Sequence, residues 1–185
     1  AQNRPKSHEP EVSEGEMWKR MEKFLRAAIP VAEKAKVRMA LHPDDPPIPE
    51  SLAGVAQICS TLEHFRRIFA IAPSDYNAML FCQGCMTELL GEGVYDAIAE
   101  MASKNKIAWV HFRNVRGALP RFAEVFMDEG DIDMRRAMEV YRDNGFNGPF
   151  MMDHTPQFPQ KKIGREVGVA YAVGYIRALI QTVYG

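Results

Sequence analysis

Short apolar segments alternate with helical patterns along this chain, and this alternation constrains its fold more than any other feature. The segments span 37–41, 77–81, 107–111 and 149–152. A parallel strand is buried on both faces, so its sequence is almost continuously apolar, and helices cover the sheet that such strands form. The sequence therefore predicts an α/β protein with about four strands in parallel (β/α) units.

Helical patterns fill the intervals between these segments. Ser13 and Glu16 have the spacing of a capping box, and apolar residues at helical intervals follow them. Pro30 lies within this first pattern, and we expect it to kink the helix or to end a segment. The further helices are expected at 61–70, 87–103, 132–144 and 164–183.

Composition excludes several classes of function. The net charge is −1, so neither nucleic acid nor a charged membrane surface is an expected partner. No apolar run approaches the roughly 20 residues that cross a bilayer. Residues 1–12 are polar and contain proline, so we expect a separate N-terminal segment that is not a signal peptide. The chain has three cysteines, an odd number that favours a reducing, cytoplasmic compartment over a disulfide framework.

A polar side chain stands at or just past the end of each predicted strand. These residues are His42, Cys82, His111 and Asp153. The carboxyl ends of parallel strands meet at one edge of a sheet, where α/β folds place their active sites. Two imidazoles, a thiolate and a carboxylate form a suitable ligand set for a divalent transition metal such as Mn, Fe, Co or Zn.

Each of the four residues also has an ordinary structural interpretation. Cys82 taken alone fits a small buried hydrophobe, and His111 fits a core histidine. His42 fits a loop cap, and Asp153 fits a turn residue. The second cysteine of the CQGC segment suggests half of a zinc knuckle, but the chain has no second cysteine pair. A common site explains all four strand ends together, so we favour it.

Longer motifs surround these strand ends. They are HPDDPP (42–47), FCQGC (81–85), VHFRNVRG (110–117), EVFMDEGDIDM (124–134) and DHTPQ (153–157). Together they resemble the mannonate dehydratase family, whose fold is a TIM-type barrel related in shape to the xylose isomerases. The likeness extends over residues 13–185. A complete (β/α)₈ barrel takes roughly 250 residues, so the resemblance implies the C-terminal half of a barrel.

The resemblance also implies an activity and a cofactor. Members of the family convert D-mannonate to 2-keto-3-deoxygluconate with loss of water, in hexuronate breakdown. The matching residues in that family bind a divalent metal, Mn²⁺ or Fe²⁺, with Co²⁺ or Zn²⁺ as alternatives; here they are His42, Cys82, His111 and Asp153. The expected partners are a small sugar acid and either further copies of the chain or a missing N-terminal half.

Further residues gain expected roles from the same resemblance. His154 matches a proton-transfer residue, and Arg113 matches an arginine close to the substrate, whose carboxylate it could pair with. Asn114 and Asp45 are expected to contact substrate, although Asn114 also fits a role in satisfying the loop backbone. Better-known family members carry a tyrosine soon after the Asp-His pair, and here no tyrosine occurs between Asp153 and Tyr171. This departure leaves the exact reaction and substrate open. Two alternatives remain: a sugar isomerase or epimerase on the same barrel, and, because the chain is about half a barrel, a truncated, non-catalytic fragment or subunit.

Overall fold

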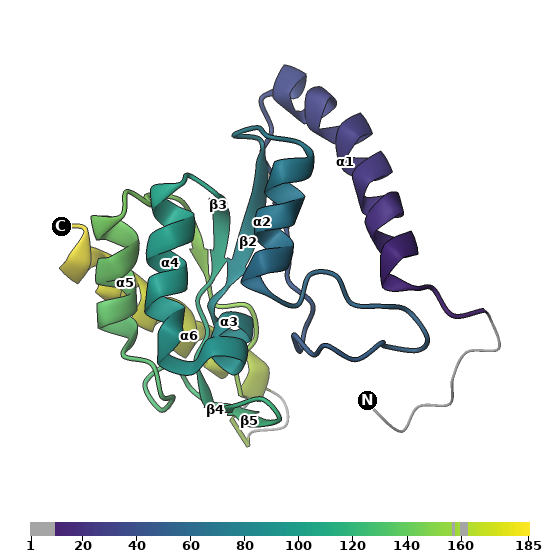
Figure 1. The fold of residues 1–185 in the computed structure, drawn as a ribbon. Helices are drawn as coiled ribbons and strands as arrows, with labels where there is room; N and C mark the ends of the chain where they lie inside the picture. Colours follow the sequence, from purple (N-terminus) through teal and green to yellow (C-terminus); the bar gives the residue numbers. More distant parts are fainter. Residues whose placement is uncertain (1–9, 157, 160–162) are drawn as a thin grey trace. The chain divides into compact units, whose positions relative to one another are not determined.

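A computed structural model describes residues 10–156, 158–159 and 163–185 (Figure 1). The chain divides into two compact units, one ending at Met79 and the other spanning Leu80–Gly185. The division falls inside a strand, β2 (Asn77–Cys82). Most of the expected N-terminal segment, 1–12, lies outside the described residues.

The first unit combines two helices with two paired strands. Its elements are α1 (Glu14–Ala35), β1 (Met39–Leu41), α2 (Leu62–Ile71) and the beginning of β2. β1 pairs with β2 in parallel, as the alternation of strands and helices predicts. α1 contacts α2, and the buried residues of α1 are Trp18, Leu25, Ile29 and Ala32.

The first helix begins as predicted but does not stop at its proline. The Ser13 hydroxyl accepts a hydrogen bond from the Glu16 N–H at 3.3 Å, which confirms the N-cap. The alternative that Pro30 ends a segment is wrong, because the helix continues to Ala35, and its C-cap, Lys36, is in the left-handed conformation. Pro30 is exposed, so water can satisfy the carbonyl group that loses its N–H donor.

The second unit carries the rest of the sheet and its covering helices. Its elements after β2 are α3 (Gln83–Leu90), η1 (Gly91–Gly93), α4 (Val94–Ser103), β3 (Ile107–His111), β4 (Val115–Ala118), β5 (Arg121–Glu124), α5 (Met134–Asp143), β6 (Phe150–Met151) and α6 (Gly164–Val183). β3 and β6 are parallel, and the strand order of the sheet is β1-β2-β3-β6. Four parallel strands with intervening helices confirm the predicted fold class.

The helix predicted over 87–103 is wrong in its extent. Two α-helices, α3 and α4, occupy this region, and the short η1 turn separates them. Gly91 ends α3 with a positive φ of 56°, which glycine adopts readily, and its N–H donates to the Thr87 carbonyl. The sequence pattern merged the two helices because both have apolar residues at helical spacing.

A β-hairpin of β4 and β5 was not predicted. It occupies the irregular stretch after β3 and lies at the carboxyl ends of the strands of this unit (Figure 1). Gly117 has a φ of 82°, and a Cβ there would lie 2.6 Å from the Arg121 carbonyl oxygen, so the hairpin requires glycine. The Leu119 N–H donates to the Glu88 carbonyl at 2.8 Å, which attaches the hairpin to α3.

An aromatic cluster packs behind the strands of the second unit. The Tyr141 ring lies 6.0 Å from Phe81, 6.3 Å from Phe112 and 5.3 Å from Phe150, measured between centroids. Tyr141, Phe81 and Phe112 are fully buried. Burial raises the pKa of the Tyr141 hydroxyl well above its ordinary value. The cluster holds the side chain of Phe112, whose neighbours in the sequence, His111 and Arg113, have expected roles in the site.

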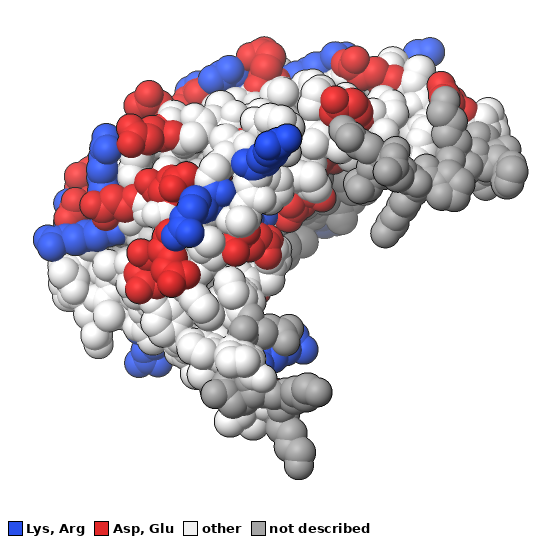
Figure 2. Space-filling model, turned by 90° about the horizontal axis from the view of Figure 1, so that it is seen from below, with Lys and Arg blue, Asp and Glu red and all other residues white. Residues whose placement is uncertain are grey.

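Among the described residues, no helix has the length and apolar character to cross a bilayer. Figure 2 shows one face, on which acidic and basic side chains are interspersed.

Candidate active site

Three of the predicted ligands lie together in the second unit. Cys82 ends β2, His111 ends β3, and Asp153 follows β6 by two residues. The ligand atoms of these side chains all lie within 4.8 Å of one another. His111 Nδ1 is 3.4 Å from Asp153 Oδ2, and Cys82 Sγ is 3.9 Å from the same oxygen.

The backbone at Asp153 has an unusual conformation. Its φ is 64°, in the left-handed region that non-glycine residues seldom occupy. Aspartate tolerates this region better than most residues. The turn ends β6 and directs the carboxylate toward His111 and Cys82, so local backbone geometry serves the cluster.

The three side chains suit a metal ion in both spacing and chemistry. Ligand atoms about 2.0–2.3 Å from one ion lie roughly 3–4 Å from each other. The distances of 3.4 and 3.9 Å agree with that spacing. An imidazole, a thiol and a carboxylate are also the donor types that first-row transition metals accept.

His42, the fourth predicted ligand, belongs to the first unit. It directly follows β1 and is half-buried, with its Nδ1 atom 2.6 Å from the Pro43 carbonyl oxygen. That oxygen can only accept, so Nδ1–H donates the hydrogen bond and Nε2 keeps the lone pair that a metal ion would bind. Its membership of the ligand set stays a prediction.

Arg113 is a buried cation that holds Asp153. Its Nε atom donates to Asp153 Oδ2 at 3.1 Å, and Nη1 donates to Glu88 Oε1 at 2.8 Å. Burial lowers the pKa of the guanidinium, but Cys82, Cys85 and Glu88 together raise it by more than burial lowers it. The pKa of Arg113 therefore lies above its ordinary value. Arg113 therefore stays charged and keeps an acidic side chain on each side.

His154 lies at the solvent side of the same group. Its side chain is 47% exposed, with Nδ1 2.9 Å from Glu124 Oε2 and Nε2 3.3 Å from Asp153 Oδ2. One nitrogen of the ring thus faces the hairpin, and the other faces the ligand cluster. This placement agrees with a proton-transfer residue, a role that stays a prediction.

Asn114 has structural contacts that occupy its whole side chain. Its amide group donates to the Met127 carbonyl at 2.8 Å and to the Ile132 carbonyl at 2.9 Å. Its oxygen accepts from the N–H groups of Val115 and Ile132. These bonds support the expectation that Asn114 satisfies the loop backbone; its contact with substrate stays a prediction.

The acidic residues after His42 belong to the first unit. The Asp44 carboxylate accepts from the Cys59 N–H at 2.8 Å, and the Asp44 N–H donates to the Cys59 carbonyl. Burial raises the pKa of the Asp44 carboxyl, whereas the bond from Cys59 opposes that shift. Asp45 is exposed. Asp44 thus anchors the loop, and Asp45 stays a predicted substrate contact.

The amino-terminal half of α6 packs on the segment after Asp153. A Cβ at Gly168 would lie 2.8 Å from the Pro156 carbonyl oxygen, so glycine permits this close approach. Tyr171 contacts the Phe126 ring and donates a hydrogen bond to the Asp128 carboxylate. Burial, followed by Asp128, raises the pKa of the Tyr171 hydroxyl.

Two acidic residues of this site were not predicted from the sequence. Glu88 and Glu124 contact Arg113 and His154, and neither stands at the end of a strand that the sequence predicted. A signal for Glu124 was available in the roughly 20 residues between the strand ending at His111 and the helix starting at Met134. Loops that follow strands in α/β units usually have about 2–6 residues, and longer ones commonly carry function.

The chain matches one protein family over nearly its whole length. The family model for D-mannonate dehydratase (UxuA) matches residues 6–184. The mannonate dehydratase of Lactococcus lactis subsp. lactis is 30% identical over 184 residues, which cover 92% of this chain and 51% of that protein. The mannonate dehydratase of Streptococcus suis (strain 05ZYH33) is 31% identical over 145 residues, covering 77% of this chain and 39% of that protein.

Solved structures show the same relationship. The crystal structure of mannonate dehydratase from Streptococcus suis serotype 2 has a TM-score of 0.75 and 28% identity, covering 92% of this chain and 51% of that one. A xylose isomerase domain protein from Alicyclobacillus acidocaldarius has a TM-score of 0.69 at 17% identity, covering 95% of this chain and 63% of that one, and shows the fold alone. The chain spans about half the length of the mannonate dehydratases that it matches.

Proposed function

This chain belongs to the mannonate dehydratase family, and on that basis we propose that it takes part in the dehydration of D-mannonate to 2-keto-3-deoxy-D-gluconate. The observation that carries the proposal is the cluster of Cys82, His111 and Asp153 at strand ends, with Arg113 and His154 in contact with Asp153.

The proposed cofactor is one divalent metal ion. Cys82, His111 and Asp153 would hold it together with His42, and Mn²⁺ or Fe²⁺ is the proposed ion, with Co²⁺ or Zn²⁺ as alternatives. The mixture of imidazole, thiol and carboxylate donors supports an ion from this group. When bound, the ion supplies positive charge that polarises substrate oxygens.

His154 is the proposed proton-transfer residue. In the overall reaction, the C–H bond beside the carboxylate breaks and its electron pair forms a double bond to the next carbon. Hydroxide leaves that second carbon and is released as water, and the resulting enol becomes the 2-keto acid. An imidazole serves such a step near neutral pH, because its ordinary pKa of ~6.5 allows both proton uptake and release. The exposure of His154 supports access to substrate.

Arg113 and its neighbours complete the proposed site. Arg113 is proposed to act near the substrate by fixing and balancing the charge of Asp153, which the contact of 3.1 Å supports. Asn114 is proposed to shape the substrate side of the site through the loop that it holds. Asp45, exposed in the loop after His42, is the proposed contact for a substrate hydroxyl group.

Metal content tests the ligand set. Protein reconstituted with Mn²⁺ or Fe²⁺ is expected to retain about one ion per chain after desalting, as measured by inductively coupled plasma mass spectrometry. His42→Ala and Asp153→Ala are expected to lose the ion, whereas Asp96→Ala, which removes an exposed carboxylate on α4, retains it. Wild-type protein that stays metal-free would contradict the proposed site.

Product analysis tests the reaction. Incubation of the metal-loaded protein with D-mannonate is expected to give a 2-keto-3-deoxy acid, measured by NMR and by a colour test for 2-keto acids. A product that retains every hydroxyl group would instead indicate isomerisation or epimerisation. Metal-loaded protein without turnover would indicate a non-catalytic fragment or subunit.

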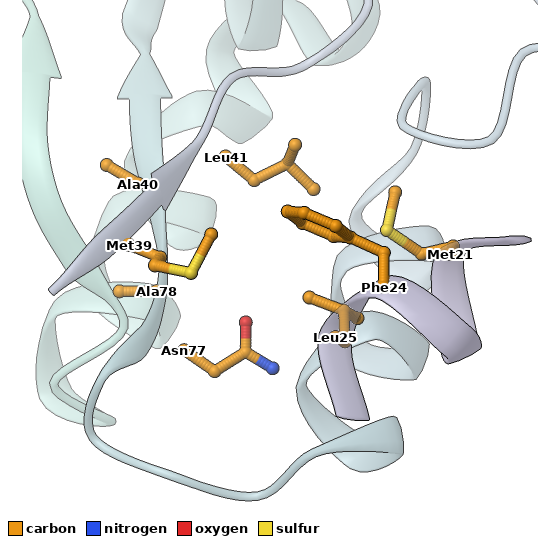
Figure 3. A pocket seen from close by; sticks show the side chains of 8 residues that line it. All are labelled: Met21, Phe24, Leu25, Met39, Ala40, Leu41, Asn77 and Ala78. Carbon is orange, nitrogen blue, oxygen red and sulfur yellow. The ribbon is translucent and has the colours of Figure 1, made fainter. Parts of the chain in front are cut away.

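A groove in the first unit supports association with further barrel strands. It has a volume of about 240 Å³ and lies between α1 and β1, with an almost wholly apolar lining (Figure 3). The side chains of Phe24 and Leu25 on α1 face Met39 and Leu41 on β1. Phe24 is 53% exposed, which is unusual for a phenylalanine in a finished core.

The backbone at this groove has room for another strand. β1 is an end strand of the described sheet, and Ala40 is exposed between Met39 and Leu41. The Met39 N–H donates to the Tyr76 carbonyl, so the backbone groups of Met39 point toward β2. Successive residues of a parallel strand point their N–H and C=O groups to opposite sides, so those of Ala40 point away from β2. The related mannonate dehydratases contain a further half that has no counterpart in this chain. We propose that a strand from such a half binds here, and that a second copy of this chain is the alternative occupant.

Light scattering distinguishes these occupants. The unmatched half of the Streptococcus suis protein serves as the probe, and a one-to-one complex is expected that Phe24→Glu weakens. Val31→Glu is the control, because Val31 is exposed on α1 but does not line the groove. A dimer of this chain that Phe24→Glu dissociates would identify a second copy instead. If this chain stays monomeric both alone and in the mixture with that half, the proposal is contradicted.

We further propose a reducing compartment such as the cytoplasm, which is supported by three buried cysteines that form no disulfide. Recovery of the protein outside the cytoplasmic fraction of lysed cells would contradict it.

A further inference from the structure

The CQGC segment places two cysteines at the beginning of α3. Cys82 is the N-cap of this helix and Cys85 is its third residue, and the two form no disulfide in the structure. Cys82 is a proposed metal ligand, whereas the proposed function gives Cys85 no role. Two cysteines with two residues between them are also the pattern of thiol–disulfide proteins. The pair is therefore a candidate site for reversible oxidation.

The geometry of a helix start brings the two side chains together. Cα atoms three residues apart in a helix are roughly 5 Å apart, and a disulfide joins Cα atoms that are roughly 4.4–6.8 Å apart. At the start of α1 the N-cap side chain reaches the third helical residue, because Ser13 Oγ lies 3.3 Å from the Glu16 nitrogen. The N-caps of α2 and α5 do the same. Cys82 makes no such capping bond, so rotation of its side chain can bring Sγ to Cys85.

Arg113 borders both sulfur atoms. Its Nη2 atom donates to Cys85 Sγ at 3.3 Å. Its Nε atom donates to Asp153 Oδ2, the oxygen that lies 3.9 Å from Cys82 Sγ. Gly84, between the two cysteines in the sequence, leaves room for the guanidinium, because a Cβ there would lie 2.3 Å from Nη1. The two thiol groups thus lie around one guanidinium.

Burial limits which oxidant can reach the pair. Both cysteines are 0% exposed, so a bulky disulfide reagent has no access to them. The nearest exposed groups belong to the ligand cluster, where the Asp153 side chain is 15% exposed and that of His154 is 47% exposed. Cys82 faces this side, so a small oxidant such as hydrogen peroxide would meet Cys82 first.

From this geometry we propose that Cys82 and Cys85 form a reversible disulfide when hydrogen peroxide oxidises them, and that the disulfide withdraws Cys82 from the metal site. In the first step a peroxide oxygen bonds to the Cys82 sulfur, the O–O bond breaks, and one water leaves behind a sulfenic acid. In the second step the Cys85 sulfur attacks that sulfur, the S–O bond breaks, and the hydroxyl group leaves as water with the thiol proton. The effect on the metal rests on the proposed function, whereas the disulfide does not.

Peptide mapping tests the disulfide directly. Trypsin releases both cysteines in one peptide, 68–104, and Cys59 in another, 39–66. Metal-free protein is treated with peroxide, unfolded and alkylated. The first peptide is then expected to carry no alkyl group, and to gain two when dithiothreitol precedes alkylation. Two alkyl groups without dithiothreitol, or none after it, overturn the inference.

Two variants identify the partners. In Cys85→Ser the second thiol is absent, so Cys82 is expected to stay a sulfenic acid that dimedone labels, whereas the wild-type protein takes up little label. Cys59→Ser is the matched control, because Cys59 is also buried but has no cysteine near it in the sequence, and it is expected to behave as the wild type. A disulfide that Cys59→Ser abolishes would overturn the assignment to Cys82 and Cys85.

Metal content supplies the second measurement. Protein oxidised before reconstitution is expected to lose its retention of Mn²⁺ and to regain it after dithiothreitol. Full retention of Mn²⁺ by protein that contains the disulfide overturns the effect on the metal site. Reduced wild-type protein that binds no Mn²⁺ contradicts the proposed function instead, and the peptide map still decides whether the disulfide forms.

Discussion

Arg113 and Glu88 form a buried ion pair in which Nη1 lies 2.8 Å from Oε1 and the side chains are 3% and 0% exposed. Glu88 comes from α3 and Arg113 follows β3, so the pair joins a helix to the strand end that supplies His111. The removal of one partner from a buried pair is costly, because the remaining charge stays out of water.

Glu88→Gln is expected to lower the free energy of unfolding by about 3 kcal/mol, since Arg113 stays buried with one charged partner fewer. Urea denaturation measures this change. Glu100→Gln is the control, because Glu100 forms an exposed pair with Lys104 at 2.8 Å, and its loss is expected to cost about 0.5 kcal/mol. Equal effects of the two substitutions would contradict a special role for the buried pair.

Gly84→Ala is expected to displace Arg113 and weaken metal binding. A Cβ at Gly84 would lie 2.3 Å from Arg113 Nη1 and 2.4 Å from Cζ. The guanidinium has no easy movement away, because Glu88 and Asp153 hold it. Loss of its contact with Asp153 is expected to reduce the affinity for Mn²⁺ about 10–100-fold, measured by calorimetric titration.

Gly174→Ala is the matched control for that substitution. Gly174 lies in α6, and a Cβ there would meet nothing within 4 Å. Alanine is expected to stabilise the helix by about 0.5–1 kcal/mol without a change in metal affinity. An unchanged affinity in Gly84→Ala as well would show that Arg113 does not position Asp153.

The parts of the molecule that the sequence predicted are those where one pattern decides the structure. Apolar runs predicted the four parallel strands, and the polar residues that end them predicted Cys82, His111 and Asp153 as neighbours. Both predictions depend on the common direction of parallel strands, which brings their carboxyl ends to one edge.

The missed features depend on contacts between residues far apart in the sequence. Glu88 meets Arg113 from 25 positions away, and Glu124 meets His154 from 30. Glu88 resembles any helical glutamate until the fold buries it. The hairpin was missed because its segments, VRGA and RFAE, have too few apolar residues for a strand pattern; Gly117 and the bond from Leu119 to α3 define it instead.

Asn114→Ala is expected to destabilise the loop between β5 and α5, which contains residues 127–132. Asn114 bonds to the backbone of Met127, Ile132 and Val115, and it is only 2% exposed. Buried groups that lose their partners cost about 1–3 kcal/mol each, so a total loss of roughly 3 kcal/mol is expected. Hydrogen exchange over 127–132 is expected to accelerate.

Asn144→Ala is the control for this prediction. The Asn144 side chain donates to the Val140 carbonyl at the end of α5, and it is partly exposed. Its loss is expected to cost about 1 kcal/mol and to leave exchange over 127–132 unchanged. If Asn114→Ala behaves in the same way, its four hydrogen bonds are not needed to hold the loop.

Cys59 is expected to stay unreactive toward alkylation at alkaline pH. Burial, followed by the charge of Asp44, raises the pKa of its thiol from 9.0 to about 12. The folded state thus favours the neutral thiol. The contribution of this thiol to the stability of the folded state is complete below pH 9 and is lost as the pH rises from 9 to about 12. Iodoacetamide labelling at pH 9, followed by peptide mass spectrometry, is expected to modify Cys59 in urea far faster than in folded protein. Comparable rates in the two states would show that the thiol ionises freely and that neither burial nor Asp44 protects it.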